Sequence, residues 1–266
     1  MSYTALTDNA GLMRYTALTE YREIITNMAD RYVKIAVLVS GGGTNLQALI
    51  DAQARGELHS GRIELVISNK EGAYALERAK KAGIETLTIV KKKPQSTPEN
   101  ASVPFTCPQA ADSRVTGIGP VTGTDGTDGK TPQQDFEERL VAALEARGIE
   151  LIILAGFMSI LSADFTKRYP ERIINVHPAL IPSFCGKGFY GLKVHEAALE
   201  YGVKVTGATV HFVNEVPDGG RIIAQKAVDI LDGDTPEILQ KRVMEQAEWI
   251  LLPKAAEQVS AQMLGK

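Results

Sequence analysis

The chain has 266 residues, of which 44% are hydrophobic and 23% are charged, and its formal net charge is −3. These ordinary globular values exclude a disordered or fibrous protein, and they give no global basic field for nucleic acid, although a local pocket could still bind a small anion. The two cysteines, Cys107 and Cys185, are too few for a disulfide framework, and they favour a reducing, cytoplasmic compartment. No apolar run reaches the length of a membrane span, about 18 residues, and no signal peptide is expected.

Residues 1–32 are predicted to be an N-terminal extension. The pentapeptide at 3–7, Tyr-Thr-Ala-Leu-Thr, recurs at 15–19. This repeat is too short to be the unit of a repeat protein. An amphipathic helix is expected at 18–28, and no chemistry is assigned to it.

Alternating strands and helices begin at Val33. Strands are expected at 33–40, 63–68, 85–90, 149–155, 173–176, 203–213 and 221–228. Helices are expected from a cap at Thr44 or Asn45, over 71–83, from Thr131-Pro132 to Gly148, and from Thr235-Pro236 onward. The last helix is expected to turn Ile238, Leu239, Val243, Ala247, Ile250 and Leu251 inward. The pattern predicts a three-layer α/β fold with a mostly parallel, Rossmann-like sheet and an antiparallel C-terminal portion.

Residues 94–130 interrupt this pattern. About half of them are Pro, Gly, Thr or Ser. This composition favours a disordered insertion over a lid that closes on the site, and both remain open. The ordered domain is therefore predicted to be 33–266, with this insertion inside it.

A glycine-rich loop, Ser40-Gly-Gly-Gly-Thr44-Asn45, joins the first strand to the first helix. Glycines let the backbone approach a phosphate, and a helix N-terminus supplies N–H donors. A dinucleotide site would need glycine at Leu46 and an acid after the second strand, where Asn69 stands. The loop therefore predicts a mononucleotide-type phosphate site, with a tight ligand-free turn as the alternative.

Asn175 and His177 stand at the end of the fifth predicted strand, before Pro178. Residues two apart in a strand share a face, so an amide and an imidazole lie side by side where open α/β sheets bind ligands. Asp218, in the turn Asp-Gly-Gly, is either a turn former or a third member of the group. If it lies near His177, it should favour the imidazolium form. His211 is expected either behind these groups or in the core.

Five segments, at 34–47, 67–70, 154–158, 175–178 and 211–220, resemble the phosphoribosylglycinamide formyltransferases, a folate-dependent family. The resemblance covers about 33–93 and 131–262. It implies that 10-formyltetrahydrofolate, as co-substrate, gives its formyl group to the amine of 5′-phosphoribosylglycinamide in de novo purine synthesis. It implies small-molecule substrates, no nucleic acid, no membrane and no metal.

The resemblance also implies roles for individual residues. The catalytic residues are expected to be Asn175, His177 and Asp218. The substrate phosphate is expected to bind to Gly43, Thr44 and Asn45. The folate is expected along Met158, Ser159, Ile160 and Leu161, beside Asn175 and near Arg78. The ribonucleotide is expected to contact Glu248 and also Glu245, which at three residues' spacing should share a helix face. The match into this last helix requires one extra residue upstream of Glu248.

Three other functions compete with this interpretation. A formyltetrahydrofolate hydrolase shares the Asn-x-His and Asp groups but would be expected to carry a longer N-terminal regulatory domain. A methionyl-tRNA formyltransferase would be expected to carry a basic tRNA-binding domain. A non-catalytic nucleotide sensor would need only the glycine loop.

Overall fold

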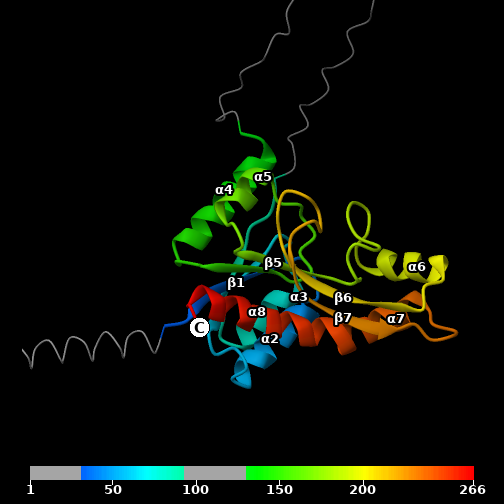
Figure 1. Cartoon of the computed structure of the whole chain (residues 1–266). Helices are drawn as coiled ribbons and strands as arrows, with labels where there is room; N and C mark the ends of the chain where they lie inside the picture. The colour runs from blue at the N-terminus through cyan, green and yellow to red at the C-terminus, as the bar shows by residue number, and fades with distance from the viewer. Residues whose placement is uncertain (1–30, 93–129) are drawn as a thin grey trace, which may run out of the picture.

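The computed structural model describes residues 31–92 and 130–266, and these form one mixed sheet with helices on both of its faces (Figure 1). The extension is predicted at 1–32 and the insertion at 94–130; residues 1–30 of the first and 94–129 of the second lie outside the described residues. None of the helices in the described part of the chain is both long and apolar enough to cross a membrane.

The sheet has seven strands in the order β3-β2-β1-β4-β5-β6-β7. Its strands are β1 Val33–Val39, β2 Gly61–Ser68, β3 Glu85–Thr88, β4 Leu151–Leu154, β5 Ile173–His177, β6 Val205–Phe212 and β7 Ile222–Asp229. The first five pair in parallel, whereas β6 and β7 join as an antiparallel hairpin beside β5. The predicted mostly parallel sheet with an antiparallel C-terminal portion is confirmed.

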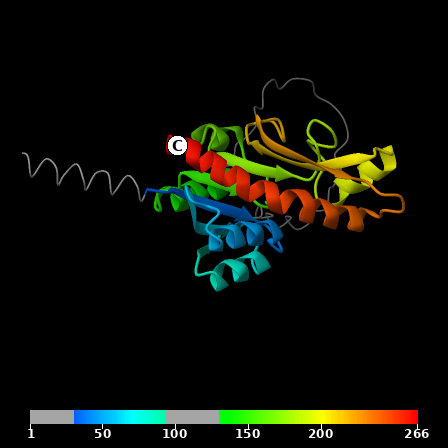
Figure 2. The same ribbon diagram turned by 60° about the horizontal axis from the view of Figure 1, so that its bottom comes forward.

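Helices cover both faces of the sheet, as the turned view in Figure 2 shows. They are α2 Thr44–Ala54, α3 Tyr74–Lys81, α4 Pro132–Glu145, α5 Ala163–Arg168, α6 Leu192–Tyr201, α7 Pro236–Val243 and α8 Trp249–Met263. Alternate residues of β1 serve the two layers, with Ile35 in the core beneath α2 and α8 and Leu38 in the core beneath α4. Because both faces are buried, the strand reads as one continuous apolar run.

Local capping decides where the helices begin. Thr131 caps α4 as predicted: its side chain accepts from the backbone N–H of Gln134, and the Thr131 N–H donates to Gln134 Oε1. The predicted side-chain cap of α2 is wrong, because the capping residue is Gly43, in the left-handed conformation. Thr44 is instead the first helical residue, which leaves its side chain and that of Asn45 available for other contacts.

The predicted C-terminal helix contains an irregular turn. It begins at the Thr235 cap, and residues Met244–Glu248 form a π turn between α7 and α8. A π turn accommodates one extra residue in a helix, and it explains the extra residue noted upstream of Glu248. The wider turn also alters which side chains face inward: Glu245 is exposed and pairs with Lys241 at 3.8 Å, whereas Glu248 is buried. The prediction that these two glutamates share a face is therefore wrong.

One apolar position of this helix also departs from its prediction. Ile238, expected to point inward, is 50% exposed, whereas Leu239 and Val243 are fully buried. The buried stripe of α7 is therefore narrower than the sequence pattern indicates.

The buried imidazole of His195 in α6 should make the folded chain less stable at acidic pH. It is fully buried, and neither ring nitrogen has a hydrogen-bond partner within the described residues. Burial lowers the pKa of His195 to about 4. Since the unfolded chain has an imidazole pKa of about 6.5, it binds a proton between these values that the folded chain rejects. Stability from this group is therefore complete above pH 6.5 and falls as the pH is lowered toward 4.

We expect His195 to remove about 2 kcal/mol of stability at pH 5 relative to pH 7.5. Urea unfolding at the two pH values should show a smaller pH dependence for His195→Leu than for the unsubstituted chain. His59→Leu, which removes an exposed imidazole, is the control. Equal pH dependence in the unsubstituted chain and His195→Leu would contradict the prediction.

Candidate active site

The candidate site lies at the carboxyl edge of the parallel strands. At β1 the chain direction across the sheet reverses, because β2 pairs on one side and β4 on the other. Ligands of open α/β sheets bind at such a switch point. The loops here are tied together: Ser40 Oγ accepts from the Met158 N–H at 2.8 Å, and Asn69 Nδ2 donates to Ser159 Oγ at 2.6 Å.

The glycine loop after β1 holds one structural glycine and two open ones. Gly43 has a φ of 72°, and a Cβ there would lie 2.6 Å from the Cβ of Ala75 in α3. A Cβ at Gly41 or Gly42 would meet nothing within 4 Å, and neither has a positive φ. Of these three loop glycines, the fold therefore requires only Gly43. The bare backbone at the other two positions is free for the close approach of a ligand.

Asn45 and Glu248 meet beside this loop. Asn45 Nδ2 donates to Glu248 Oε2 at 2.7 Å, and both residues are buried. Burial raises the pKa of the Glu248 carboxyl, against the smaller opposing effect of the Asn45 hydrogen bond. The π turn thus places Glu248, one of the two glutamates predicted to contact the ribonucleotide, beside the glycine loop, whereas Glu245 lies on the exposed side of the helix.

Arg78 also belongs to the glycine-loop side of the site. Its Nε donates to the carbonyl oxygen of Gly42 at 2.8 Å, and its Nη1 donates to Gln47 Oε1 at 3.0 Å. The predicted folate segment at 158–161 provides none of these contacts. The structure therefore places this arginine with the predicted phosphate residues.

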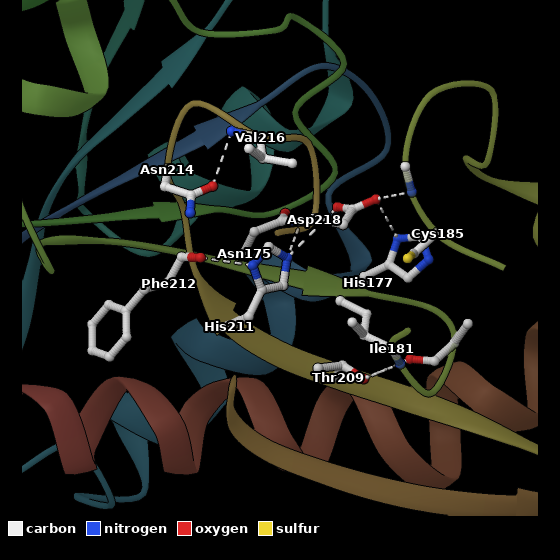
Figure 3. A network of polar contacts seen from close by, with 12 residues as sticks. Asn175, His177, Ile181, Cys185, Thr209, His211, Phe212, Asn214, Val216 and Asp218 are labelled. Carbon is white, nitrogen blue, oxygen red and sulfur yellow. Dashed lines mark hydrogen bonds and ion pairs between the residues drawn. The ribbon is translucent and has the colours of Figure 1, made fainter. Parts of the chain in front are cut away.

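The strand pairing gathers the polar side chains on one face, as predicted for Asn175 and His177. Across the antiparallel pair, Asn175 lies opposite His211 and His177 lies opposite Thr209. His211 Nδ1 donates to the Phe212 carbonyl oxygen at 2.8 Å, so its Nε2 can accept from Asn175 Nδ2 at 3.3 Å (Figure 3). His211 thereby orients the amide of Asn175.

Asp218 joins the two imidazoles. Its Oδ2 lies 3.6 Å from His177 Nδ1, and its Oδ1 lies 3.6 Å from His211 Nε2 (Figure 3). The turn that presents it is tight: Asp218 has a φ of 54°, and a Cβ at Gly220 would overlap the carbonyl oxygen of Phe212. Asp218 is therefore both a turn residue and a member of the polar group.

The charge state of Asp218 follows from its surroundings. Burial alone would raise the pKa of its carboxyl. The Gly186 N–H, which donates to Asp218 Oδ2 at 2.8 Å, and the two nearby imidazoles together outweigh burial, and the pKa of the carboxyl lies below its usual value. Asp218 is therefore a carboxylate at neutral pH.

His177 differs from its predicted charge state. Burial lowers the pKa of its imidazole, and the raising effect of Asp218 is smaller. Its Nε2–H donates to the Phe184 carbonyl oxygen at 2.8 Å, which leaves Nδ1 without a proton in the neutral ring. The expected imidazolium is therefore wrong for the resting state, because desolvation outweighs the nearby carboxylate. The structure instead provides a basic nitrogen that faces Asp218.

A cavity of about 130 Å³ joins the predicted folate segment to this polar group. Ser159, Ile160 and Leu161 line one side, and Asn175, His211 and Asp218 line the other. Ile160 is 73% exposed and Met158 is 53% exposed, so apolar surface stands open near the carboxylate and amide. This volume is below the roughly 300 Å³ at which small-molecule sites begin, so the cavity fits only one end of a large ligand.

Sequence reasoning missed the loop after β5 as a support for the site. The Phe184 carbonyl and the Gly186 N–H contact His177 and Asp218, and Phe184 has a φ of 49°. The sequence signal for this loop was its two glycines, Gly186 and Gly188, close to the catalytic candidates. Burial and Asp218 raise the pKa of the Cys185 thiol, which does not suit a nucleophile.

Within 31–92 and 130–266, His, Cys, Asp and Glu side chains form no group of three or more that could hold a metal ion.

Comparison with known proteins identifies the family. The model of the family described as formyl transferase matches residues 33–255. The chain belongs to this formyl transferase family. It is 36% identical, over 81% of its length, to the chloroplastic phosphoribosylglycinamide formyltransferase of Arabidopsis thaliana. It is 35% identical, over 80% of its length, to the phosphoribosylglycinamide formyltransferase of Haemophilus influenzae, of which it covers 81%.

Solved structures of this family share the fold. The glycinamide ribonucleotide transformylase 1 of Symbiobacterium toebii has a TM-score of 0.66 and 35% identity, with 87% of this chain and 89% of that chain covered. The chain spans 62% of the length of the Arabidopsis relative and 20% of the trifunctional purine biosynthetic protein adenosine-3 of Gallus gallus.

Proposed function

We propose that the chain transfers the formyl group of 10-formyltetrahydrofolate to the amine of 5′-phosphoribosylglycinamide, a step of de novo purine biosynthesis. One observation carries the proposal: a single cavity is lined by Asn175, Asp218 and the segment Ser159–Leu161. The names and the identities of the formyl transferase relatives support the same reaction.

In the proposed reaction, the glycinamide amine attacks the formyl carbon, and the carbonyl oxygen becomes an oxyanion. Asn175 donates to this oxyanion from the amide that His211 orients. One such donor is typically worth about 10²–10³ in rate. The structural support is the hydrogen bond between Asn175 Nδ2 and His211 Nε2, which holds the amide in place before substrate binds.

The attacking amine must lose a proton, and the leaving folate nitrogen must gain one. We propose that the Asp218 carboxylate, directly or through a water, receives the amine proton and that Nδ1 of His177 shares it. The resulting imidazolium faces a carboxylate 3.6 Å away, while its Nε2–H remains on Phe184. Because burial lowers the pKa of His177, the imidazolium readily returns the proton to the leaving nitrogen.

Substrate binding is proposed to divide between the two sides of the site. Gly43, Thr44 and Asn45 hold the ribonucleotide phosphate at the start of α2, and Glu248 contacts the ribonucleotide beside them. Met158, Ser159, Ile160 and Leu161 contact the folate together with Asn175. We assign Arg78 to the ribonucleotide side, since it contacts Gly42, and we give Glu245 no substrate contact.

The other sequence-based assignments remain proposals. Residues 33–266 are proposed to be the catalytic domain, with 1–32 as an extension and 94–130 as an insertion, and the family match at 33–255 supports this division. Cys185 has no disulfide partner within the part of the chain that the structure describes, which supports a reducing, cytoplasmic compartment. The proposed chemistry is acyl transfer between nitrogens and needs no metal.

A coupled assay with 5′-phosphoribosylglycinamide and 10-formyltetrahydrofolate tests the function. We expect formylated ribonucleotide and free tetrahydrofolate in equal amounts. Release of formate without formylated ribonucleotide would instead identify a hydrolase. Binding of the ribonucleotide with no turnover would identify a sensor.

A further inference from the structure

A second, larger cavity of about 820 Å³ lies between α2 and α3. It starts at the amino ends of the strands, where Tyr32 precedes β1 and Arg62 is the second residue of β2. The candidate active site is at the opposite, carboxyl edge of the sheet. The volume falls within the roughly 300–1,000 Å³ of small-molecule sites.

The lining of this cavity is cationic, although the chain has a net charge of −3. Arg62, Arg78 and Lys81 line it, and among its described lining residues there is no aspartate or glutamate. Arg62 does pair with Glu64 at 3.3 Å, but both side chains are partly exposed, and such a pair is weak. The cavity therefore offers a local positive field to an anion.

Aromatic rings stand beside two of these cations. The Arg62 guanidinium lies over the Tyr32 ring at 5.4 Å, and the Arg78 guanidinium lies over the Tyr74 ring at 5.0 Å. Tyr74, Arg78 and Lys81 are spaced by four and three residues on α3, which places them on one helix face. Guanidinium planes and tyrosine rings both stack on flat heteroaromatic rings, and arginine also binds phosphate with paired donors.

We propose that this cavity is a second binding site for a nucleotide, separate from the substrate site. Its phosphate would bind between Arg62 and Lys81, and its base would stack near Tyr74. Arg78, which also contacts the glycine loop, is shared between the two sites, whereas Tyr32, Arg62, Tyr74 and Lys81 have no role in the proposed formyl transfer.

Arg78 connects the two sites. It lines the cavity, and its Nε holds the Gly42 carbonyl of the glycine loop at 2.8 Å. A base that stacks on Tyr74 would displace the Arg78 guanidinium from that ring and weaken the contact with Gly42, and the KM for the ribonucleotide should then rise. This coupling rests on the proposed function, whereas binding at the second site does not.

Calorimetry with adenosine 5′-monophosphate as the probe tests the proposal. The double variant Arg62→Gln/Lys81→Gln is expected to raise the Kd at least tenfold. The matched control is Lys80→Gln, because Lys80 is also on α3 but pairs with Glu77 and does not line the cavity. It should leave the Kd within twofold. Gly41→Asp, which blocks the glycine loop, should also leave it unchanged.

Two further probes test the chemical class. Tyr74→Leu should weaken binding of the nucleotide while binding of inorganic phosphate stays the same, because only the base uses the ring. As a comparison ligand we choose unconjugated γ-linked triglutamate, an anion without an aromatic ring, which should bind more weakly than the nucleotide. If it binds as tightly as the nucleotide, or if Gly41→Asp abolishes nucleotide binding while Arg62→Gln/Lys81→Gln does not, the proposed site is wrong. No detectable nucleotide binding to the unsubstituted chain would also overturn it.

Discussion

Replacing Asp218 by asparagine is expected to lower kcat by about 10²–10⁴ while the chain stays folded. The amide can still accept the Gly186 N–H, so the turn keeps its hydrogen bond. It cannot receive a proton from the amine, and it no longer stabilises an imidazolium at His177. The loss should appear in kcat more than in KM, because the carboxylate acts on the proton and not on the phosphate.

Steady-state assays of purified Asp218→Asn, with circular dichroism to check folding, measure this effect. Asp232→Asn, which removes an exposed carboxylate from the turn between β7 and α7, is the control and should keep normal turnover. His177→Ala should lose activity to a similar degree. Because the two groups share one proton, the double variant should lose little more than the worse single variant. Multiplicative losses, or near-normal kcat in folded Asp218→Asn, would contradict the proposed relay.

The sheet could be predicted because its strands carry strong local signals. The apolar run at 33–40 and the turn at Asp218-Gly-Gly depend on nearby residues alone, and they match β1 and the hairpin of β6 and β7. Asn175 and His177 share a face because side chains alternate along a strand. Local pattern was therefore sufficient for the fold and for the pair at the end of β5.

The remaining features depend on contacts between distant parts of the chain. The charge of His177 depends on its burial and on its hydrogen bond to the Phe184 carbonyl oxygen, which sequence spacing does not reveal. The position of Glu248 depends on a π turn, whose sequence signal was the one extra residue upstream. The place of Arg78 depends on how α3 packs against the glycine loop. Each of these requires the tertiary structure, because the same residues could satisfy local rules in several ways.

The structure also shows where the phosphate hypothesis can be tested without damage to the fold. At Gly43 any side chain meets Ala75 and a left-handed backbone, so Gly43→Ala is expected to lose about 1–3 kcal/mol of stability in urea unfolding. Weaker ribonucleotide binding by Gly43→Ala would therefore reflect strain in the loop backbone and would not test the phosphate contact. Gly41 is exposed and has open space around its backbone, so a substitution there changes the approach of a ligand and leaves the loop intact.

Gly41→Asp is expected to raise the Kd of the ribonucleotide at least a hundredfold, because it places a negative charge where a phosphate should approach the start of α2. Folate binding should change less than twofold, since the predicted folate segment lies after β4. Gly41→Asn adds a side chain of nearly equal size without the charge, and its Kd should rise far less. Calorimetry with each substrate on the three proteins separates charge from bulk. If the two variants weaken the ribonucleotide equally, steric exclusion and not phosphate repulsion acts at the loop. If folate affinity falls instead, the glycine loop binds the other substrate.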